Sequence, residues 1–238
     1  MQHLRLLLSQ DARRRLLLAA AALAGGCDGG DGSEPSPDVA ALEDAASDAP
    51  PCEVALGEIA AEPQAVVELR GEDGTPIPLE DGDDVPLIRP LQGGHVVFIG
   101  ARITNICGNN AQLRGWVRHA SDGNLVNLEG RTLDFDPIKG DEAWGRPNYA
   151  GIAGVTNVPV CPNNTGRPLL GGPVLISAEV EDRAGRTVVS PQVAVNLVCT
   201  QESKECRGLC ECECDEDYDL GDGCDLPQGT DCALFTTP

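Results

Sequence analysis

The sequence HVVFIGARITNI, residues 95–106, carries the strongest β-strand signal in this chain. Every second position is apolar, and alternation of this kind places the apolar side chains on one face of a strand. That face comprises Val97, Ile99, Ala101 and Ile103. Because Gly93-Gly94 directly precedes the run, we expect a tight turn that leads into a buried strand.

Shorter alternating runs with turn signals between them surround this segment. They are residues 65–70, 112–119, 125–128, 174–181 and 186–198. The turns SDGN at 121–124 and DRAG at 182–185 are typical of β-hairpins. No stretch shows a helical period. The pattern predicts an all-β fold, a single antiparallel β-sandwich over residues 52–199.

Two irregularities in this region give narrower expectations. In residues 112–119 the alternation slips at Gly115, which favours a β-bulge there. Residues 137–172 are rich in Gly, Pro and Asn and low in pattern, so we expect a long loop there, with room for one short strand at most. A loop of this length is usually functional or fixed by a disulfide.

The middle of the chain resembles the immunoglobulin-like and fibronectin-III-like sandwiches found in many bacterial surface lipoproteins. The resemblance covers residues 60–199 and is carried by QGGHVVF at 92–98, by Trp116 and by the hairpin at 174–198. An antibody-type domain would join its second and sixth strands by a disulfide, yet residues 174–181 hold no cysteine. The resemblance therefore implies a general sandwich, and a fold of this kind implies no activity by itself.

The N-terminus has the order of a secretory signal peptide, which we place at residues 1–26. Arg13-Arg14-Arg15 precedes an apolar run at 16–23, which is shorter than the roughly 20 residues of a membrane span. Residues 23–27, LAGGC, resemble a lipobox, in which a signal peptidase cleaves before a diacylated cysteine, here Cys27. The usual leucine is displaced by one position. The run RRRLL also resembles a twin-arginine signal, so the export route stays open.

Ordinary cleavage after Ala24 competes with lipidation, and the cysteine count helps to choose between them. The chain has 11 cysteines, so lipidation of Cys27 leaves ten that can pair completely. Ordinary cleavage would leave one thiol unpaired in an oxidising compartment, which is unusual. We therefore expect a lipid-anchored protein of the bacterial cell envelope, which faces the periplasm or the cell surface.

Acidic residues dominate the composition, and the formal net charge is −21. Residues 28–69 carry 11 acidic and no basic residues. A surface of this sign repels phosphates, which excludes nucleic-acid binding. Residues 27–51 contain no aromatic residue and read as a disordered acidic tether between the lipid and the folded part.

Residues 200–238 form an acidic, cysteine-rich tail with almost no core-forming residues, so cross-links should replace a core there. The disulfide candidates of the whole chain are Cys52, Cys107, Cys161, Cys199, Cys206, Cys210, Cys212, Cys214, Cys224 and Cys232. We expect the six tail cysteines to pair among themselves and the other four to brace the sandwich. The run CECEC at 210–214 also permits a soft-metal site, although the tail has no histidine and no C-x2-C pair.

A weak calcium hypothesis rests on Asp215, Asp217 and Asp219, whose spacing resembles the start of a calcium-binding loop. Leu220 and Leu226 stand where such a loop needs glycine and a bidentate glutamate. A solvated acidic loop is the simpler interpretation, and no cofactor is predicted.

The sequence contains none of the common hydrolase, metalloprotease or phosphate-binding motifs. His95 and His119 have no evident nucleophile partner and are expected to be structural. We therefore predict a non-catalytic structural or binding module with an unknown protein or glycan ligand. One alternative is a periplasmic hydrolase or carbohydrate-binding domain, in which Trp144, Tyr149 and nearby acids would gather in a cleft. A metal-binding tail is the other.

Overall fold

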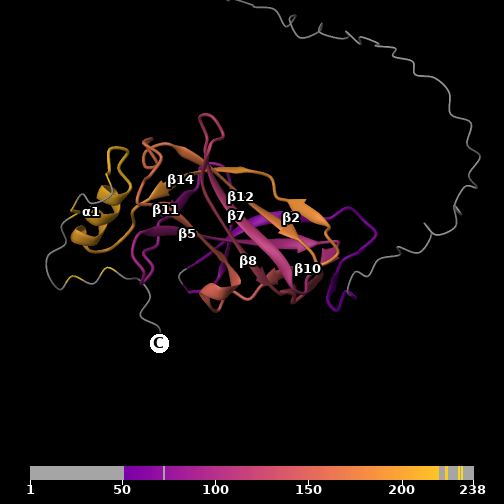
Figure 1. Ribbon diagram of the computed structural model, residues 1–238. Helices are drawn as coiled ribbons and strands as arrows, with labels where there is room; N and C mark the ends of the chain where they lie inside the picture. Colours follow the sequence, from indigo (N-terminus) through magenta and orange to yellow (C-terminus); the bar gives the residue numbers. More distant parts are fainter. Residues whose placement is uncertain (1–50, 72, 220–222, 225–229, 231, 233–238) are drawn as a thin grey trace, which may run out of the picture. The chain divides into compact units, whose positions relative to one another are not determined.

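The computed structural model describes residues 51–238 except 72, 220–222, 225–229, 231 and 233–238 (Figure 1). The expected signal peptide, Cys27 and all but the last residue of the expected tether lie outside the described residues. No helix in the described part is long and apolar enough to cross a membrane.

The described chain is mostly β-structure, arranged in two six-stranded sheets and one two-stranded sheet. In the first sheet the order is β3 (Pro76–Pro78), β2 (Gln64–Arg70), β5 (His95–Thr104), β10 (Asp141–Pro147) and β9 (Phe135–Ile138), and β11 (Thr156–Cys161) also pairs with β5. In the second sheet the order is β4 (Asp84–Pro86), β14 (Val193–Val198), β12 (Pro173–Glu181), β7 (Ala111–His119) and β8 (Leu125–Leu133), and β13 (Thr187–Val189) pairs with β12. The small sheet joins β1 (Ala55–Leu56) to β6 (Ile106–Cys107). Every pairing between named strands is antiparallel except that of β4 with β14.

Both large sheets contribute to one apolar core, and β5 lies at its centre. The predicted inward face of residues 95–106 is confirmed, because Val97, Ile99, Ala101 and Ile103 are at most 1% exposed and belong to that core. The opposite face of β5 is also buried. There, Phe98 packs with Tyr149 and Val155 in a second apolar cluster. The segment between β10 and β11 therefore covers the face that a half-buried strand would leave to solvent.

Most of the predicted strands are present in the structure with small changes in their ends. Residues 65–70 lie in β2, 112–119 in β7, 125–128 in β8 and 174–181 in β12. The run 186–198 is divided into β13 and β14, and Pro191 lies between them. Proline has no N–H to donate to a neighbouring strand, which explains the interruption.

The expectation of a long loop at residues 137–172 was wrong. This region contains β10, a 3-10 turn at Ile152–Gly154 and β11. Both strands pair with β5. The sequence pattern did not reveal these strands because they contain Gly145, Pro147 and Pro159, residues that are uncommon in strands.

The predicted bulge at Gly115 was also wrong. The pairing of β7 with β12 continues without a shift from Gln112 to His119, and the irregularity toward β8 lies between Val117 and Arg118. A Cβ atom at position 115 would meet the side chains of Thr156 and Ile99 in the first sheet. The glycine therefore serves close packing between the sheets. Trp116 points the other way and is half-buried beneath the Arg118 guanidinium.

The tail contains a helix that the sequence did not predict, α1 (Lys204–Glu213), which lies at one end of the sheets near β11 and β14 (Figure 1). The Ser203 hydroxyl accepts a hydrogen bond from the Cys206 N–H and so caps its first turn. Cys206, Cys210 and Cys214 recur at four-residue spacing, which places them on one side of a helix. This spacing was the overlooked helical signal.

The packing at Gly115 gives a first prediction. In Gly115→Ala the new methyl group would force Thr156 and Ile99 apart, and overpacking of this kind typically lowers the free energy of unfolding by about 1–3 kcal/mol. Urea denaturation of the purified protein measures this loss. Gly172→Ala is the matched control, because a Cβ atom at Gly172 meets nothing within 4 Å. Equal midpoints for the two variants would contradict the packing role.

Candidate functional site

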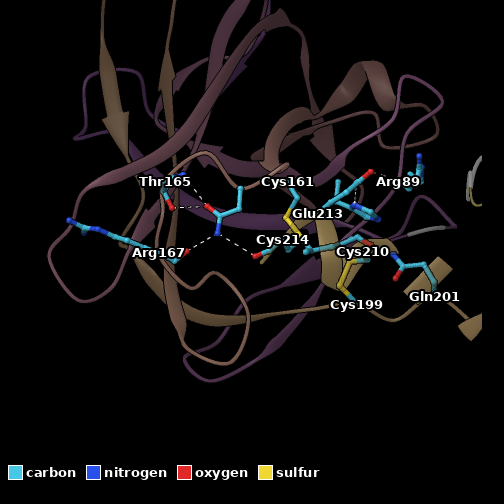
Figure 2. Close-up of a disulfide and its surroundings, with 12 residues drawn as sticks. Arg89, Cys161, Thr165, Arg167, Cys199, Gln201, Cys210, Glu213 and Cys214 are labelled. Atoms are coloured by element: carbon cyan, nitrogen blue, oxygen red, sulfur yellow. Dashed lines mark hydrogen bonds and ion pairs between the residues drawn. A yellow bond between two sulfur atoms is a disulfide. The ribbon is translucent and has the colours of Figure 1, made fainter. Parts of the chain in front are cut away.

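Among the described residues, histidine, cysteine and glutamate side chains gather where α1 meets the ends of β5, β11 and β14 (Figure 2). The Cys161–Cys214 disulfide joins the end of β11 to the residue that follows α1. The Cys199–Cys210 disulfide joins the residue after β14 to the last turn of α1. Together these bridges fix the C-terminal half of the helix against both large sheets.

The predicted pairing of the tail within itself was wrong. Only Cys206–Cys232 and Cys212–Cys224 are internal to the tail, while Cys52–Cys107 lies outside it. The other two tail cysteines bind the sheets, and Cys210 and Cys214 belong to the main apolar core. The helix therefore shares the core of the sheets, because its own few apolar residues could not form a core.

His95 is the first residue of β5 and is fully buried beside this helix. Its Nδ1 lies 2.9 Å from Oε2 of Glu213, the last residue of α1. Because a carboxylate only accepts hydrogen bonds, Nδ1 donates the proton of this bond. In the neutral imidazole the lone pair is then on Nε2. That atom is buried and has no hydrogen-bond partner.

The carboxylate of Glu213 also faces a second cation. Its Oε1 lies 3.9 Å from Nη1 of Arg89, a residue in the segment before β5. Figure 2 shows Glu213 between the Cys161–Cys214 disulfide and Arg89. Its negative charge is partly compensated by Arg89, so Glu213 can accept the Nδ1 proton of His95 inside a largely buried site.

Two sulfur atoms complete the group around the imidazole. The ligand atoms of His95, Cys210 and Cys214 lie within 4.8 Å of one another, and all three residues are buried. In the part of the chain that the structure describes, this is the only set of three or more His, Cys, Asp or Glu residues with that spacing. Metals bind thiolates, so these sulfurs are not metal ligands while both are in disulfides.

Asn163 fastens the loop after β11 to the end of the helix. Its backbone N–H donates to the Glu213 carbonyl at 2.8 Å, and its Nδ2 donates to the carbonyls of Arg167 and Cys214 at 2.7 and 3.3 Å. Its Oδ1 accepts two hydrogen bonds from Thr165. Figure 2 shows dashed lines that end at Thr165, Arg167 and Cys214. Together these bonds hold the loop and the Cys214 end of α1 to each other.

Gln201 holds the other end of the helix. Its Nε2 donates to the Leu87 carbonyl at 2.8 Å, and its own carbonyl accepts from the Arg207 guanidinium. The first turn of the helix is therefore fastened to the segments that lead into β5 and out of β14, and its last turn is fastened to the loop after β11. This arrangement fixes the position of Glu213 relative to His95.

The calcium candidates Asp215, Asp217 and Asp219 lie in the turn after α1 and are exposed. Asp215 Oδ1 accepts a hydrogen bond from the Asp217 N–H at 2.9 Å, as in an Asx turn. They do not form a set of three carboxylates within 4.8 Å among the described residues.

Trp144 and Tyr149, the aromatic residues of the alternative enzyme or sugar-binding hypothesis, lie in different surroundings. Tyr149 is buried under Gly100, and its hydroxyl donates to Glu68 at 3.5 Å. Burial and the nearby Glu68 charge raise the pKa of the Tyr149 phenol above its usual value. Trp144 is half-buried, with the Arg102 guanidinium 5.0 Å from its ring centroid.

Trp144 also borders an open cleft of about 540 Å³. The rest of the lining is mostly apolar and includes Leu79, Val189 and Pro191. Neither Tyr149 nor any acidic residue lines this cleft. The expected gathering of Trp144, Tyr149 and acids in one cleft is therefore not found.

His119 lies at the end of β7, far along the chain from the helix, in a separate polar group. It is 4% exposed, and the Asp122–Arg167 ion pair is its charged neighbour. Burial and the Arg167 charge lower the pKa of the imidazole, while the Asp122 charge partly opposes them.

Comparison with protein-family models and with curated proteins finds no match for this chain.

Asn163 provides a test of how the helix is attached. Asn163→Ala would leave the carbonyls of Arg167 and Cys214 without these donors, and loss of a buried hydrogen-bond partner costs about 1–3 kcal/mol. Urea denaturation should show a loss of this size. The neighbouring Asn164 is exposed, so Asn164→Ala should leave the midpoint nearly unchanged. A wild-type midpoint for Asn163→Ala would contradict this role.

His119 predicts a pH dependence of stability. Because its pKa is lowered in the folded protein, the unfolded chain takes up a proton first as the pH falls below about 6.5. The free energy of unfolding should therefore decrease as the pH falls through this range. His119→Gln removes this contribution, so its stability should decrease less between pH 8 and 5.5. Identical pH slopes from urea titrations of the two proteins would refute the prediction.

Proposed function

We propose that the chain is an exported, lipid-anchored protein of the bacterial cell envelope, with a non-catalytic role as a structural or binding module. The observation that carries this proposal is the cysteine pairing: all ten cysteines after Cys27 form five disulfides. Disulfides at this density are typical of oxidising compartments. The pairing leaves Cys27 as the single cysteine available for a lipid.

We further propose that residues 52–199 form a single β-sandwich of the general immunoglobulin-like or fibronectin-III-like kind. Support comes from the shared core of the two six-stranded sheets and from the approach of Gly115 in one to Ile99 in the other. Trp116 is outside that core, unlike the buried tryptophan of antibody domains.

The non-catalytic part of the proposal rests on how the polar groups are used. His95, Glu213 and Asn163 bind neighbouring elements of the fold to one another. Tyr149 bonds to Glu68, which also accepts a 2.8 Å hydrogen bond from Arg146. These contacts are those of side chains that stabilise a fold. The unknown partner would then be a protein or glycan at the envelope.

Intact mass of the mature protein, purified from a bacterial host in unreduced and reduced form, tests the proposal. We expect an N-terminus at Cys27 with an added diacylglycerol, no titratable thiol, and a mass increase on reduction that corresponds to five disulfides. An unlipidated N-terminus at Gly25 would overturn the anchor. Two or more thiols in the unreduced protein would overturn the pairing.

A matched pair of variants separates the anchor from the disulfides. Cys27→Ser should abolish partitioning into detergent and membrane attachment. Cys52→Ser should leave the anchor intact and expose one thiol on Cys107, because it breaks only the Cys52–Cys107 bridge. Retention of Cys27→Ser in the membrane would contradict lipidation at that residue.

A further inference from the structure

The buried imidazole of His95 has one ring nitrogen without a hydrogen-bond partner, and two sulfur atoms lie beside the ring. Nε2 of this fully buried residue has no hydrogen-bond partner, and a buried polar atom without a partner destabilises the fold. The sulfurs of Cys210 and Cys214 lie within 4.8 Å of a His95 ring nitrogen and of each other. A buried imidazole with one unpartnered ring nitrogen, together with two converging sulfurs, is the donor set of a soft or borderline metal ion.

The spacing of these atoms fits a tetrahedral metal centre. Zinc binds cysteine sulfur at about 2.3 Å and histidine nitrogen at about 2.0–2.1 Å, so ligand atoms in such a centre are roughly 3.5–4 Å apart. The observed spacing of no more than 4.8 Å leaves only a small contraction. Cys210 and Cys214 are four residues apart and therefore lie on the same side of the helix.

The surroundings of His95 are those of a metal-binding histidine. Such residues almost always donate the proton of their other ring nitrogen to a carboxylate, a carbonyl or water, which fixes the tautomer. The 2.9 Å bond from Nδ1 to Glu213 is of this type. Glu213 itself is fixed by Arg89 and by the attachments of α1.

We propose that the reduced protein binds one Zn²⁺ ion through His95, Cys210 and Cys214, with a water molecule as the fourth ligand. The two cysteine sulfurs become available only when the Cys161–Cys214 and Cys199–Cys210 bridges are broken. The site is closed in the oxidised protein because both disulfides withhold the thiolates. This metal site is separate from the proposed envelope function and does not depend on the lipid anchor.

An external dithiol opens the site by thiol–disulfide exchange. Cys199 is half-buried, whereas Cys210 is fully buried, so attack occurs at the Cys199 sulfur and Cys210 leaves as a thiolate. The second thiol of the reagent then displaces Cys199, and the dithiol becomes a disulfide as the protein bridge gains two electrons and two protons. A second equivalent reduces Cys161–Cys214. Metal binding releases the protons of the coordinating thiols.

The double variant Cys161→Ser/Cys199→Ser tests the site without a reductant. It frees the thiols of Cys210 and Cys214 and keeps the other three disulfides. With the protein handled anaerobically, Co²⁺ should give the visible absorption bands of a tetrahedral thiolate complex, and one equivalent of Zn²⁺ should abolish them. Native mass spectrometry should show one zinc ion per chain.

Variants in this background identify the ligands. Adding His95→Gln should lower the Zn²⁺ affinity by at least about tenfold, and Glu213→Gln should lower it about 10–100-fold through the orientation of the imidazole. The matched control is Cys206→Ser/Cys212→Ser, which also frees two thiols, on Cys232 and Cys224, without involving His95. That control and the oxidised wild-type protein should give no tetrahedral cobalt spectrum.

Two results would overturn the proposal. One is a folded Cys161→Ser/Cys199→Ser protein that gives no cobalt spectrum, and the other is a spectrum and affinity that His95→Gln does not change. If circular dichroism shows that the double variant is unfolded, the dithiol-reduced wild-type protein decides. There, cobalt binding that His95→Gln weakens supports the site, and binding of equal strength or none refutes it.

Discussion

Burial of β5 on both faces is the constraint on which the rest of this structure depends. One face needs the second sheet, and Gly115 allows that sheet to approach Ile99. The other needs the segment after β10, which brings Tyr149 over Gly100. A strand that is apolar on both faces is stable only when two layers cover it, because each exposed face would lose about 25 cal/mol of stabilisation per Å² of apolar surface.

Polar residues at the edges of this buried strand decide where other parts of the chain lie. His95 begins β5 inside the protein, and its Nδ1 is satisfied by Glu213 from the tail helix. Glu68 on the neighbouring strand is 3% exposed and is paired with Arg146. An unpaired buried charge or ring nitrogen is costly, so these partners link distant segments to β5. The cysteine-rich tail is positioned in this way and is then held by Cys161–Cys214 and Cys199–Cys210.

The same packing gives the cysteines of α1 two possible roles, in disulfide cross-links and in the proposed metal site. The disulfides of the helix attach a segment with too few apolar residues to form a core of its own, which suits a protein in an oxidising compartment. They also bring the sulfurs of Cys210 and Cys214 to one buried histidine. Cross-linking in the oxidised state and the proposed metal binding in the reduced state are thus two uses of the same atoms. Their separation depends on the redox state of the two bridges.

The sequence by itself determined the features that depend on neighbouring residues in the chain or on the number of cysteines. Alternation placed Val97, Ile99, Ala101 and Ile103 in the core, and the turn signals located most strands. This was possible because successive side chains of a strand point to opposite faces, so a strand shows its buried face as every second residue of the sequence. The tertiary structure decided what depends on contacts between distant segments. β10 and β11 are defined by their pairing with β5, and Gly115 is explained by Ile99 and Thr156. Cysteine spacing carries no information about which sulfurs meet, so only the fold could pair Cys161 with Cys214 and bring His95 to a tail that has no histidine of its own.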